Sequence, residues 1–183
     1  GEEVMGSVPI RWGVVATGGI AEKFCEACAY EAERTGRSEL YAVASRNTAK
    51  AEAFAASHGI KHAYGSYEEL FADPSVDAVY IATPHNLHAS LSIAALNAGK
   101  AVLCEKPVSL TAEEFYPVAE TARKTGRFFM EAMWTKFNPA VNHALEWVRN
   151  GKIGTPEFIR CDFFLQAPYN PSARLFDPRL GGG

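Results

Sequence analysis

A regular alternation of short apolar segments with helix-forming segments is the strongest constraint on the fold, and it runs through residues 9–133. Each apolar segment is followed by a turn or a capping residue and then by apolar residues at helical spacing. Strands joined through helices need crossover connections, which make them parallel neighbours in one sheet. The sequence therefore predicts an α/β fold, a doubly wound parallel sheet of the Rossmann type. The predicted strands are Ile10–Ala16, Leu40–Ala44, Ala78–Ala82, Ala101–Cys104 and Phe128–Met133.

The alternation stops after residue 133. Pro139–Arg149 has the pattern of a helix, and Glu157–Leu165 has the aromatic and β-branched content of a strand. One strand needs partners, and the chain ends soon after it. We therefore expect residues 9–133 to form a nucleotide-binding domain and residues 134–183 to be the incomplete beginning of a second domain.

Composition excludes several classes of function. The chain has 183 residues, with 18 Lys+Arg against 21 Asp+Glu and a formal net charge of −3. This balance gives no basic footprint for nucleic acid, and no apolar stretch approaches the roughly 20 residues that span a bilayer. No signal-peptide pattern opens the chain. We expect a cytoplasmic protein without nucleic-acid or membrane partners.

Cys25 and Cys28 form a C-x-x-C pair, which is compatible with a redox centre or half of a zinc site. A structural zinc site needs about four ligands, and no second pair follows at suitable spacing. His85 and His88, at i and i+3, have no acidic residue near them in sequence to complete a site. We therefore predict that no metal is bound and that the two thiols line a helix.

The turn after the first strand resembles the dinucleotide fingerprint G-x-G-x-x-G/A. Ala16 replaces the first glycine, and Gly18 and Ala21 match the other two positions. The helix that follows would offer free N–H groups and a partial positive charge to a pyrophosphate. Alanine is tolerable at this position in a turn with negative φ, and an ordinary strand–helix turn remains the alternative. The predicted cofactor-binding residues here are Ala16, Thr17, Gly18, Gly19, Ile20 and Ala21.

The end of the second strand sets the preference for the cofactor's ribose. An acidic residue there would favour NAD, but this chain has Ser45 and Arg46. A guanidinium and a hydroxyl suit a 2′-phosphate. The sequence predicts NADP rather than NAD, unless Arg46 is simply a solvated surface residue.

Two further segments follow strands at the carboxyl edge, where ligands of such folds bind. The first contains Thr83, Pro84, His85 and His88, which we predict to shape a cofactor pocket; helix-terminal residues without a role are the alternative. The second, Glu105-Lys106-Pro107, has a proline that keeps the lysine out of helical geometry. A lysine beside a cationic nicotinamide could exchange a proton with a substrate hydroxyl, although a Lys-Pro pair at a strand end can also be structural.

Together these segments resemble the glucose-fructose oxidoreductase, inositol dehydrogenase and rhizopine-catabolism family, Gfo/Idh/MocA. Glu105-Lys106-Pro107 is the most specific element, and Thr83-Pro84 with His88 reinforces it. Residues 130–139 and 170–178 resemble the branch of dimeric dihydrodiol dehydrogenases and NADP-dependent D-xylose 1-dehydrogenases.

The resemblance implies a Rossmann domain followed by a domain with an open, mostly antiparallel sheet, which forms the substrate site and a homodimer interface. It implies that Lys106 is the catalytic lysine, that Glu105 and Lys106 contact the cofactor and that Trp134 lines the substrate pocket. A second acid/base residue, Tyr or His, would follow the closing triple glycine, beyond Gly183.

The implied activity is NADP-dependent oxidation of a small-molecule sugar hydroxyl, as in a D-xylose-like aldose, or of a cyclic trans-dihydrodiol, by hydride transfer to the nicotinamide. A non-catalytic NADP-binding regulatory protein is the alternative, and Lys106 argues against it because a regulator does not need that lysine. A third hypothesis is an inactive fragment of the enzyme. We expect the 183-residue chain to bind NADP but not to turn over substrate.

Overall fold

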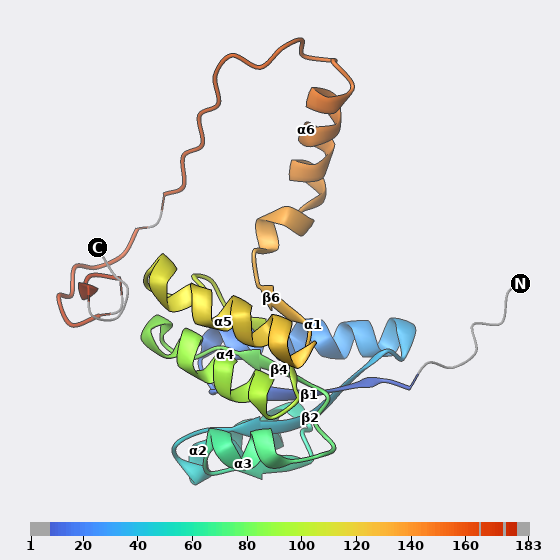
Figure 1. Ribbon diagram of the computed structural model, residues 1–183, viewed down its shortest axis with the longest axis vertical. Coiled ribbons are helices and arrows are strands. Elements are labelled where there is room, and N and C mark those ends of the chain that lie inside the picture. Colours follow the sequence, from blue (N-terminus) through green and yellow to red (C-terminus); the bar gives the residue numbers. More distant parts are fainter. Residues whose placement is uncertain (1–7, 165, 174, 179–183) are drawn as a thin grey trace, which may run out of the picture. The chain divides into compact units, whose positions relative to one another are not determined.

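A computed structural model describes residues 8–164, 166–173 and 175–178. The chain divides into two compact units, residues 1–131 and 132–183, and each is described by itself. In the described part of the first unit, strands and helices alternate (Figure 1). The strands are β1 (Ile10–Val15), β2 (Ser38–Ala44), β3 (His62–Tyr64), β4 (Ala78–Ile81), β5 (Ala101–Cys104) and β6 (Phe129–Glu131). The helices are α1 (Gly19–Thr35), α2 (Thr48–His58), α3 (Tyr67–Ala72), α4 (His88–Asn97) and α5 (Ala112–Thr125), with a 3₁₀ turn, η1, at His85–Leu87.

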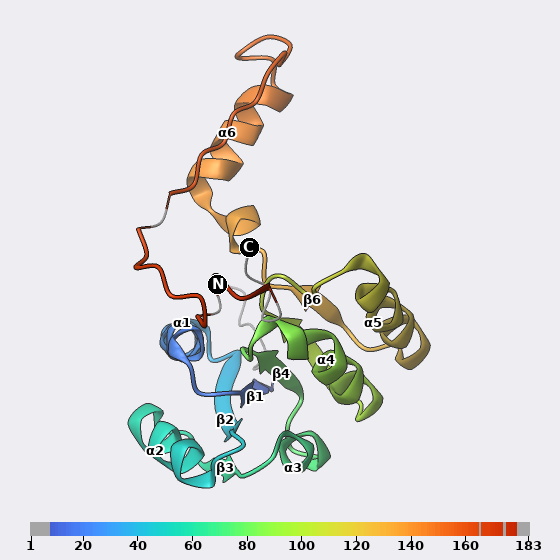
Figure 2. The same cartoon turned by 90° about the vertical axis from the view of Figure 1, so that its left-hand side faces the viewer.

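The strands form one parallel sheet in the order β3-β2-β1-β4-β5-β6. Helices α1 and α2 lie on one face of the sheet, and α3, α4 and α5 lie on the other (Figure 2). The chain order reverses between β1 and β4, which makes their carboxyl ends the topological switch point. The predicted doubly wound Rossmann sheet is confirmed.

Two apolar cores lie on the two faces of the sheet because successive strand residues point to opposite sides. Val14, Val43 and Tyr80 pack with residues of α1 and α2, whereas Val15, Val79 and Ile81 pack with residues of α3, α4 and α5. Helix and sheet approach closely at Gly13, where an added Cβ would lie 2.8 Å from Leu70 Cδ2. This position therefore has no room for a side chain.

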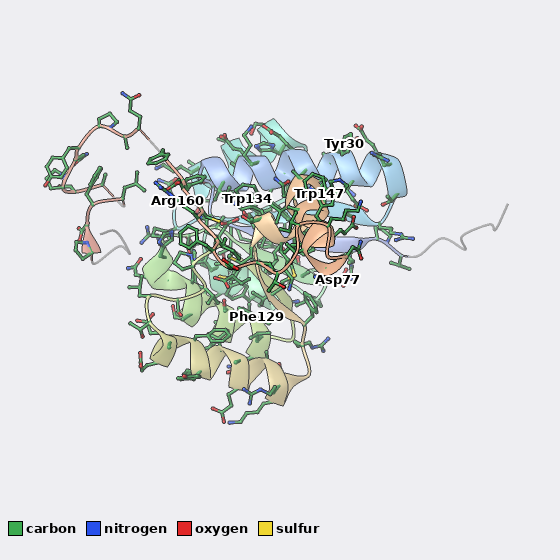
Figure 3. The ribbon with its side chains drawn as sticks, turned by 90° about the horizontal axis from the view of Figure 1, so that it is seen from above. Tyr30, Asp77, Phe129, Trp134, Trp147 and Arg160 are labelled. Atoms are coloured by element: carbon green, nitrogen blue, oxygen red, sulfur yellow. The ribbon has the colours of Figure 1, made fainter. Side chains whose placement is uncertain are left out.

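Capping residues mark the beginnings and ends of the helices. The Ser66 and Thr111 side chains accept hydrogen bonds from the backbone N–H groups of Glu69 and Glu114. Gly126 closes α5 with a left-handed φ of 64°, a conformation that costs glycine little. At the opposite, amino-terminal edge of the sheet, Arg11 pairs with Asp77 at 3.0 Å (Asp77 is labelled in Figure 3). None of the helices in the described part of the chain is long and apolar enough to cross a membrane.

The second unit begins with a 3₁₀ turn, η2 (Trp134–Phe137), followed by α6 (Pro139–Arg149), as the sequence predicts. Asn138 caps α6 by accepting hydrogen bonds from Ala140 and Val141 N–H. The strand predicted over Glu157–Leu165 is wrong for residues 157–164, which have no regular secondary structure, and Leu165 lies outside the described residues. A strand is stabilised by ladder hydrogen bonds, and within the described residues no second strand pairs with this segment.

Candidate active site at the carboxyl edge of the sheet

Four loops leave the carboxyl ends of β2, β1, β4 and β5, which are neighbours in the sheet. Backbone hydrogen bonds tie the first residue of each loop to the adjacent strand. Ala16 N–H donates to Ala44 O at 2.9 Å, Ala82 N–H to Val15 O at 3.0 Å and Glu105 N–H to Ile81 O at 2.9 Å. The segments that the sequence singles out in this unit therefore meet along one edge.

The turn after β1 differs from the expectation in one respect. Ala16 has a φ of 83°, so the turn does not have the negative φ at which alanine is tolerable. The position requires the left-handed backbone that the fingerprint's first glycine would normally supply. An L-residue there costs roughly 1–2 kcal/mol, so this turn is strained.

The amino-terminal end of α1 has free capacity to bind an anion. Gly18 is its N-cap and supplies no side chain to cap the helix. Its carbonyl accepts from Ala21 and Glu22 N–H at 2.9 and 3.2 Å. A Cβ built at Gly18 or Gly19 would meet nothing within 4 Å, so the space before the helix is open. Such N-termini bind phosphate groups.

The end of β2 presents Ser45 and Arg46. The Ser45 hydroxyl is buried and accepts from Asn47 N–H at 3.3 Å, which leaves its own O–H able to donate. Arg46 is exposed and hydrogen-bonds the Tyr67 hydroxyl; burial raises the pKa of that hydroxyl, and Arg46 opposes the rise. Asn47 is committed to capping α2 through Lys50 N–H at 3.0 Å. Ser45 and Arg46 are therefore the groups available here to a phosphate.

A hollow of about 860 Å³ lies between the start of α2 and α3. Its lining includes the carboxylates Glu69 and Asp73 but no basic side chain. Negative charge does not suit a phosphate, so this hollow is a poorer match for the phosphate end of a nucleotide than Ser45 and Arg46 are.

The loop after β4 contains two histidines with different surroundings. His88 is fully buried, with Nδ1 2.7 Å from Pro107 O and Nε2 2.9 Å from Thr83 O. Its ring therefore links the loops after β4 and β5 from inside. The ring of His85 lies 5.4 Å from that of His88. The Thr83 hydroxyl is buried with no hydrogen-bond partner among the described residues.

Glu105, Lys106 and Pro107 follow β5, and the Lys106–Pro107 peptide is cis. The side chain of Lys106 is exposed, whereas both carboxylate oxygens of Glu105 are engaged. Tyr80 O–H donates to one oxygen at 2.6 Å, and Lys106 N–H donates to the other at 3.2 Å. Glu131 Oε1 accepts from Val108 N–H at 3.0 Å just beyond the motif. The buried Tyr80 and the partly buried Glu105 and Glu131 thus hold the loop, while the Lys106 side chain stays accessible.

Two of these supporting residues, Tyr80 and Glu131, were not predicted from the sequence. Tyr80 did leave a signal, because it places a hydroxyl within the apolar run Ala78–Ala82. A buried tyrosine hydroxyl usually has a hydrogen-bond partner. The identity of that partner depends on strand pairing, which brings β4 and β5 together.

Cys25, Cys28 and Cys104 are buried free thiols, and burial raises the pKa values of Cys25 and Cys28 to about 12 and about 11. Such thiols are poor nucleophiles near neutral pH. In the described part of the chain no group of three or more His, Cys, Asp or Glu side chains is placed to hold a metal ion. Trp134 belongs to the second unit, so its role in a substrate pocket stays a prediction.

The residues at this edge fit a dinucleotide. An uncapped helix terminus with open space before it suits the pyrophosphate, and an exposed arginine beside a free O–H suits a ribose phosphate. The Thr83 hydroxyl, which is buried without a hydrogen-bond partner among the described residues, lies in the same loop as the two histidines. Fold and site together define a dinucleotide-binding protein of the Rossmann type.

Comparison with known proteins identifies the family of dinucleotide-binding proteins to which this chain belongs. Residues 10–133 match the family described as GFO_IDH_MocA, "Oxidoreductase family, NAD-binding Rossmann fold". The chain belongs to this Gfo/Idh/MocA family.

Two curated relatives are similar along most of this chain. A trans-1,2-dihydrobenzene-1,2-diol dehydrogenase from Bos taurus is 42% identical over 156 residues, covering 84% of this chain and 45% of the relative. A D-xylose 1-dehydrogenase (NADP(+)) from Hypocrea jecorina is 40% identical over 190 residues, covering 95% and 49%. This chain therefore spans about half the length of the curated relatives that it matches.

The fold also matches solved structures. The crystal structure of an NAD binding oxidoreductase from Klebsiella pneumoniae superimposes with a TM-score of 0.76 at 34% identity, covering 80% of this chain and 40% of that one. This similarity supports the Rossmann assignment made from the sheet order.

Proposed function

We propose that the whole protein is an NADP-dependent dehydrogenase that oxidises a sugar hydroxyl or a cyclic trans-dihydrodiol. The observation that carries the proposal is the exposed Lys106 side chain at the carboxyl edge, in a loop held by partly buried hydrogen bonds. Relatives named as dihydrodiol and NADP-dependent D-xylose dehydrogenases support the substrate class. Because these relatives are named as dehydrogenases, they favour an enzyme over a non-catalytic NADP-binding regulatory protein.

The roles of the residues follow from their positions. The α1 terminus at Gly18 and Gly19 binds the pyrophosphate, with Ala16, Thr17, Ile20 and Ala21 shaping its turn. Ser45 and Arg46 bind the 2′-phosphate of NADP. Thr83, Pro84 and His85 border the nicotinamide half, and His88 and Glu105 support it from inside.

Catalysis combines the cofactor's redox chemistry with proton handling by the protein. When bound, the nicotinamide ring accepts a hydride from the substrate carbon. Lys106 Nζ orients the reacting hydroxyl and assists the departure of its proton.

The proposal assigns residues 9–133 to the NADP-binding domain and residues 134–183 to the first part of a domain that forms the substrate site and a homodimer interface. Trp134 lines the substrate pocket in this scheme. We place the protein in the cytoplasm, and the free thiols of its cysteines are in keeping with a reducing compartment.

The test is Lys106→Met in the whole protein, which removes the ammonium group but keeps an unbranched side chain. We expect the turnover number to fall by about 100-fold or more while NADP affinity changes by less than about threefold. Lys124→Met, on the exposed side of α5, is the matched control and should leave both values unchanged. Near-normal turnover in Lys106→Met would contradict the proposal and favour a binding function.

A further inference from the structure

The carboxylate of Glu105 is turned into the protein rather than towards a ligand. Tyr80 O–H donates to Oε1 at 2.6 Å, and Lys106 N–H donates to Oε2 at 3.2 Å. A phenol-to-carboxylate distance in this range is typical of a strong, charge-assisted hydrogen bond. Glu105 therefore joins the core of the sheet to the backbone of the lysine.

Tyr80 itself is held firmly. It lies on β4, is only 3% exposed and stacks on Phe24 of α1 with ring centroids 4.0 Å apart and an interplanar angle of 12°. Trp12 packs edge-on against Phe24 at 5.2 Å. The phenol oxygen thus has a fixed position set by three aromatic rings from two strands and one helix.

Tyr80 acts as a hydrogen-bond donor and not as a proton source. Burial, together with the neighbouring Glu105, raises the pKa of Tyr80 far above its ordinary value. The phenol therefore stays protonated throughout the neutral range and keeps its O–H for the hydrogen bond to Glu105.

The loop beyond Lys106 is fixed at two more points. The His88 ring lies 2.7 Å from Pro107 O, and Glu131 accepts from Val108 N–H at 3.0 Å. The backbone is thus anchored on both sides of Lys106, while the Lys106 side chain is exposed. This arrangement suits a lysine that must keep one direction, since small misplacements of a reacting group reduce rate strongly.

We propose that Tyr80 is a positioning residue for Lys106, acting through the carboxylate of Glu105. The inference rests on the proposed function, in which Lys106 handles the substrate proton. It assigns Glu105 to support of the lysine backbone rather than to contact with the cofactor. Tyr80→Phe should therefore affect the lysine although Tyr80 touches neither cofactor nor substrate.

The first measurement needs no cofactor. Tyr80→Phe keeps the aromatic stack but removes the donor to Glu105 Oε1. We expect the amide hydrogen of Lys106 to exchange roughly tenfold faster in the variant, because its acceptor is no longer held in place. Amides of β4 and β5 should keep their protection. Tyr30→Phe, on the exposed side of α1, is the control and should leave exchange at Lys106 unchanged.

The second measurement uses the whole protein with NADP and substrate. Tyr80→Phe should lower kcat by roughly tenfold with little change in the KM for NADP, and its pH profile of kcat should shift. Combining Tyr80→Phe with Glu105→Ala should lower kcat no further than Glu105→Ala alone, since both remove one connected unit.

The two measurements distinguish a failure of the positioning role of Tyr80 from a failure of the proposed dehydrogenase function. Unchanged exchange at Lys106 together with unchanged kcat in Tyr80→Phe would overturn the positioning role and leave the proposed function standing. Loss of protection throughout β4 and β5 would also overturn it, because Tyr80 would then be a general core residue. Wild-type protein that shows no NADP-dependent turnover would overturn the proposed function, and the exchange measurement would still report on the contact itself.

Discussion

Replacing His88 by leucine tests how the two loops at the carboxyl edge are held together. The side chain is fully buried, and its two ring nitrogens lie 2.9 Å from Thr83 O and 2.7 Å from Pro107 O. Leucine fills a similar space but donates no hydrogen bond. The substitution therefore removes a link between segments 19 residues apart in sequence.

The expected loss of stability follows from the environment of each of the two carbonyl oxygens. The contact with Thr83 O is buried, and leaving such a carbonyl without a donor costs about 1–3 kcal/mol. A ring with one N–H donates to only one of the two carbonyls. The contact with Pro107 O is partly buried, so water can take its place there and the added loss is about 1 kcal/mol or less. We expect His88→Leu to lower the free energy of unfolding by about 1–4 kcal/mol, a large share of the 5–15 kcal/mol typical of domains.

Urea unfolding followed by circular dichroism measures this loss through the transition midpoint, with the slope m as a check on two-state behaviour. His88→Gln keeps an N–H donor and should lose less than His88→Leu. His143→Leu removes an exposed histidine from α6 and is the matched control. A stability within about 0.5 kcal/mol of wild type for His88→Leu would refute the reasoning that the ring joins the loops.

Two further predictions concern stability. Ala16→Gly should raise the free energy of unfolding by about 0.5–1 kcal/mol in urea titrations. The reason is that relief of the strain at a φ of 83° outweighs the conformational entropy that glycine adds to the unfolded chain. A lower stability of Ala16→Gly would contradict the strained turn. Stability should also fall as pH rises from 9 towards 12 in a series of urea titrations. Burial raises the pKa values of Cys25 and Cys104 from 9.0 to about 12, so the unfolded chain releases these protons first. A flat profile across that range would show that these thiols are not desolvated.

Much of the fold is readable from the sequence because its signals are local. Thr111 caps α5 and Gly126 ends it through contacts within a few residues, so the pattern that predicts them also contains their partners. The strand order follows from the crossover rule once strands and helices alternate. These features need no knowledge of distant contacts.

The remaining features depend on contacts that the sequence does not reveal. Tyr80 meets Glu105 and His88 meets Pro107 across 25 and 19 residues, and only strand pairing brings them together. Positive φ at Ala16 is set by the geometry of the turn rather than by the residue's own preference. The segment 157–164 has strand-like composition but no strand to pair with among the described residues, so composition alone misleads there.

We propose that the carboxyl edge of this sheet binds NADP in preference to NAD, with Arg46 on the 2′-phosphate. Titration calorimetry with both cofactors, before and after Arg46→Ala, measures this preference. We predict that wild-type protein binds NADP more tightly and that Arg46→Ala weakens NADP by about 10- to 150-fold, or about 1.5–3 kcal/mol, while NAD affinity is unchanged. Arg123→Ala, an exposed arginine on α5, should change neither affinity. Equal affinities of the wild type for NADP and NAD would contradict the proposed preference for NADP.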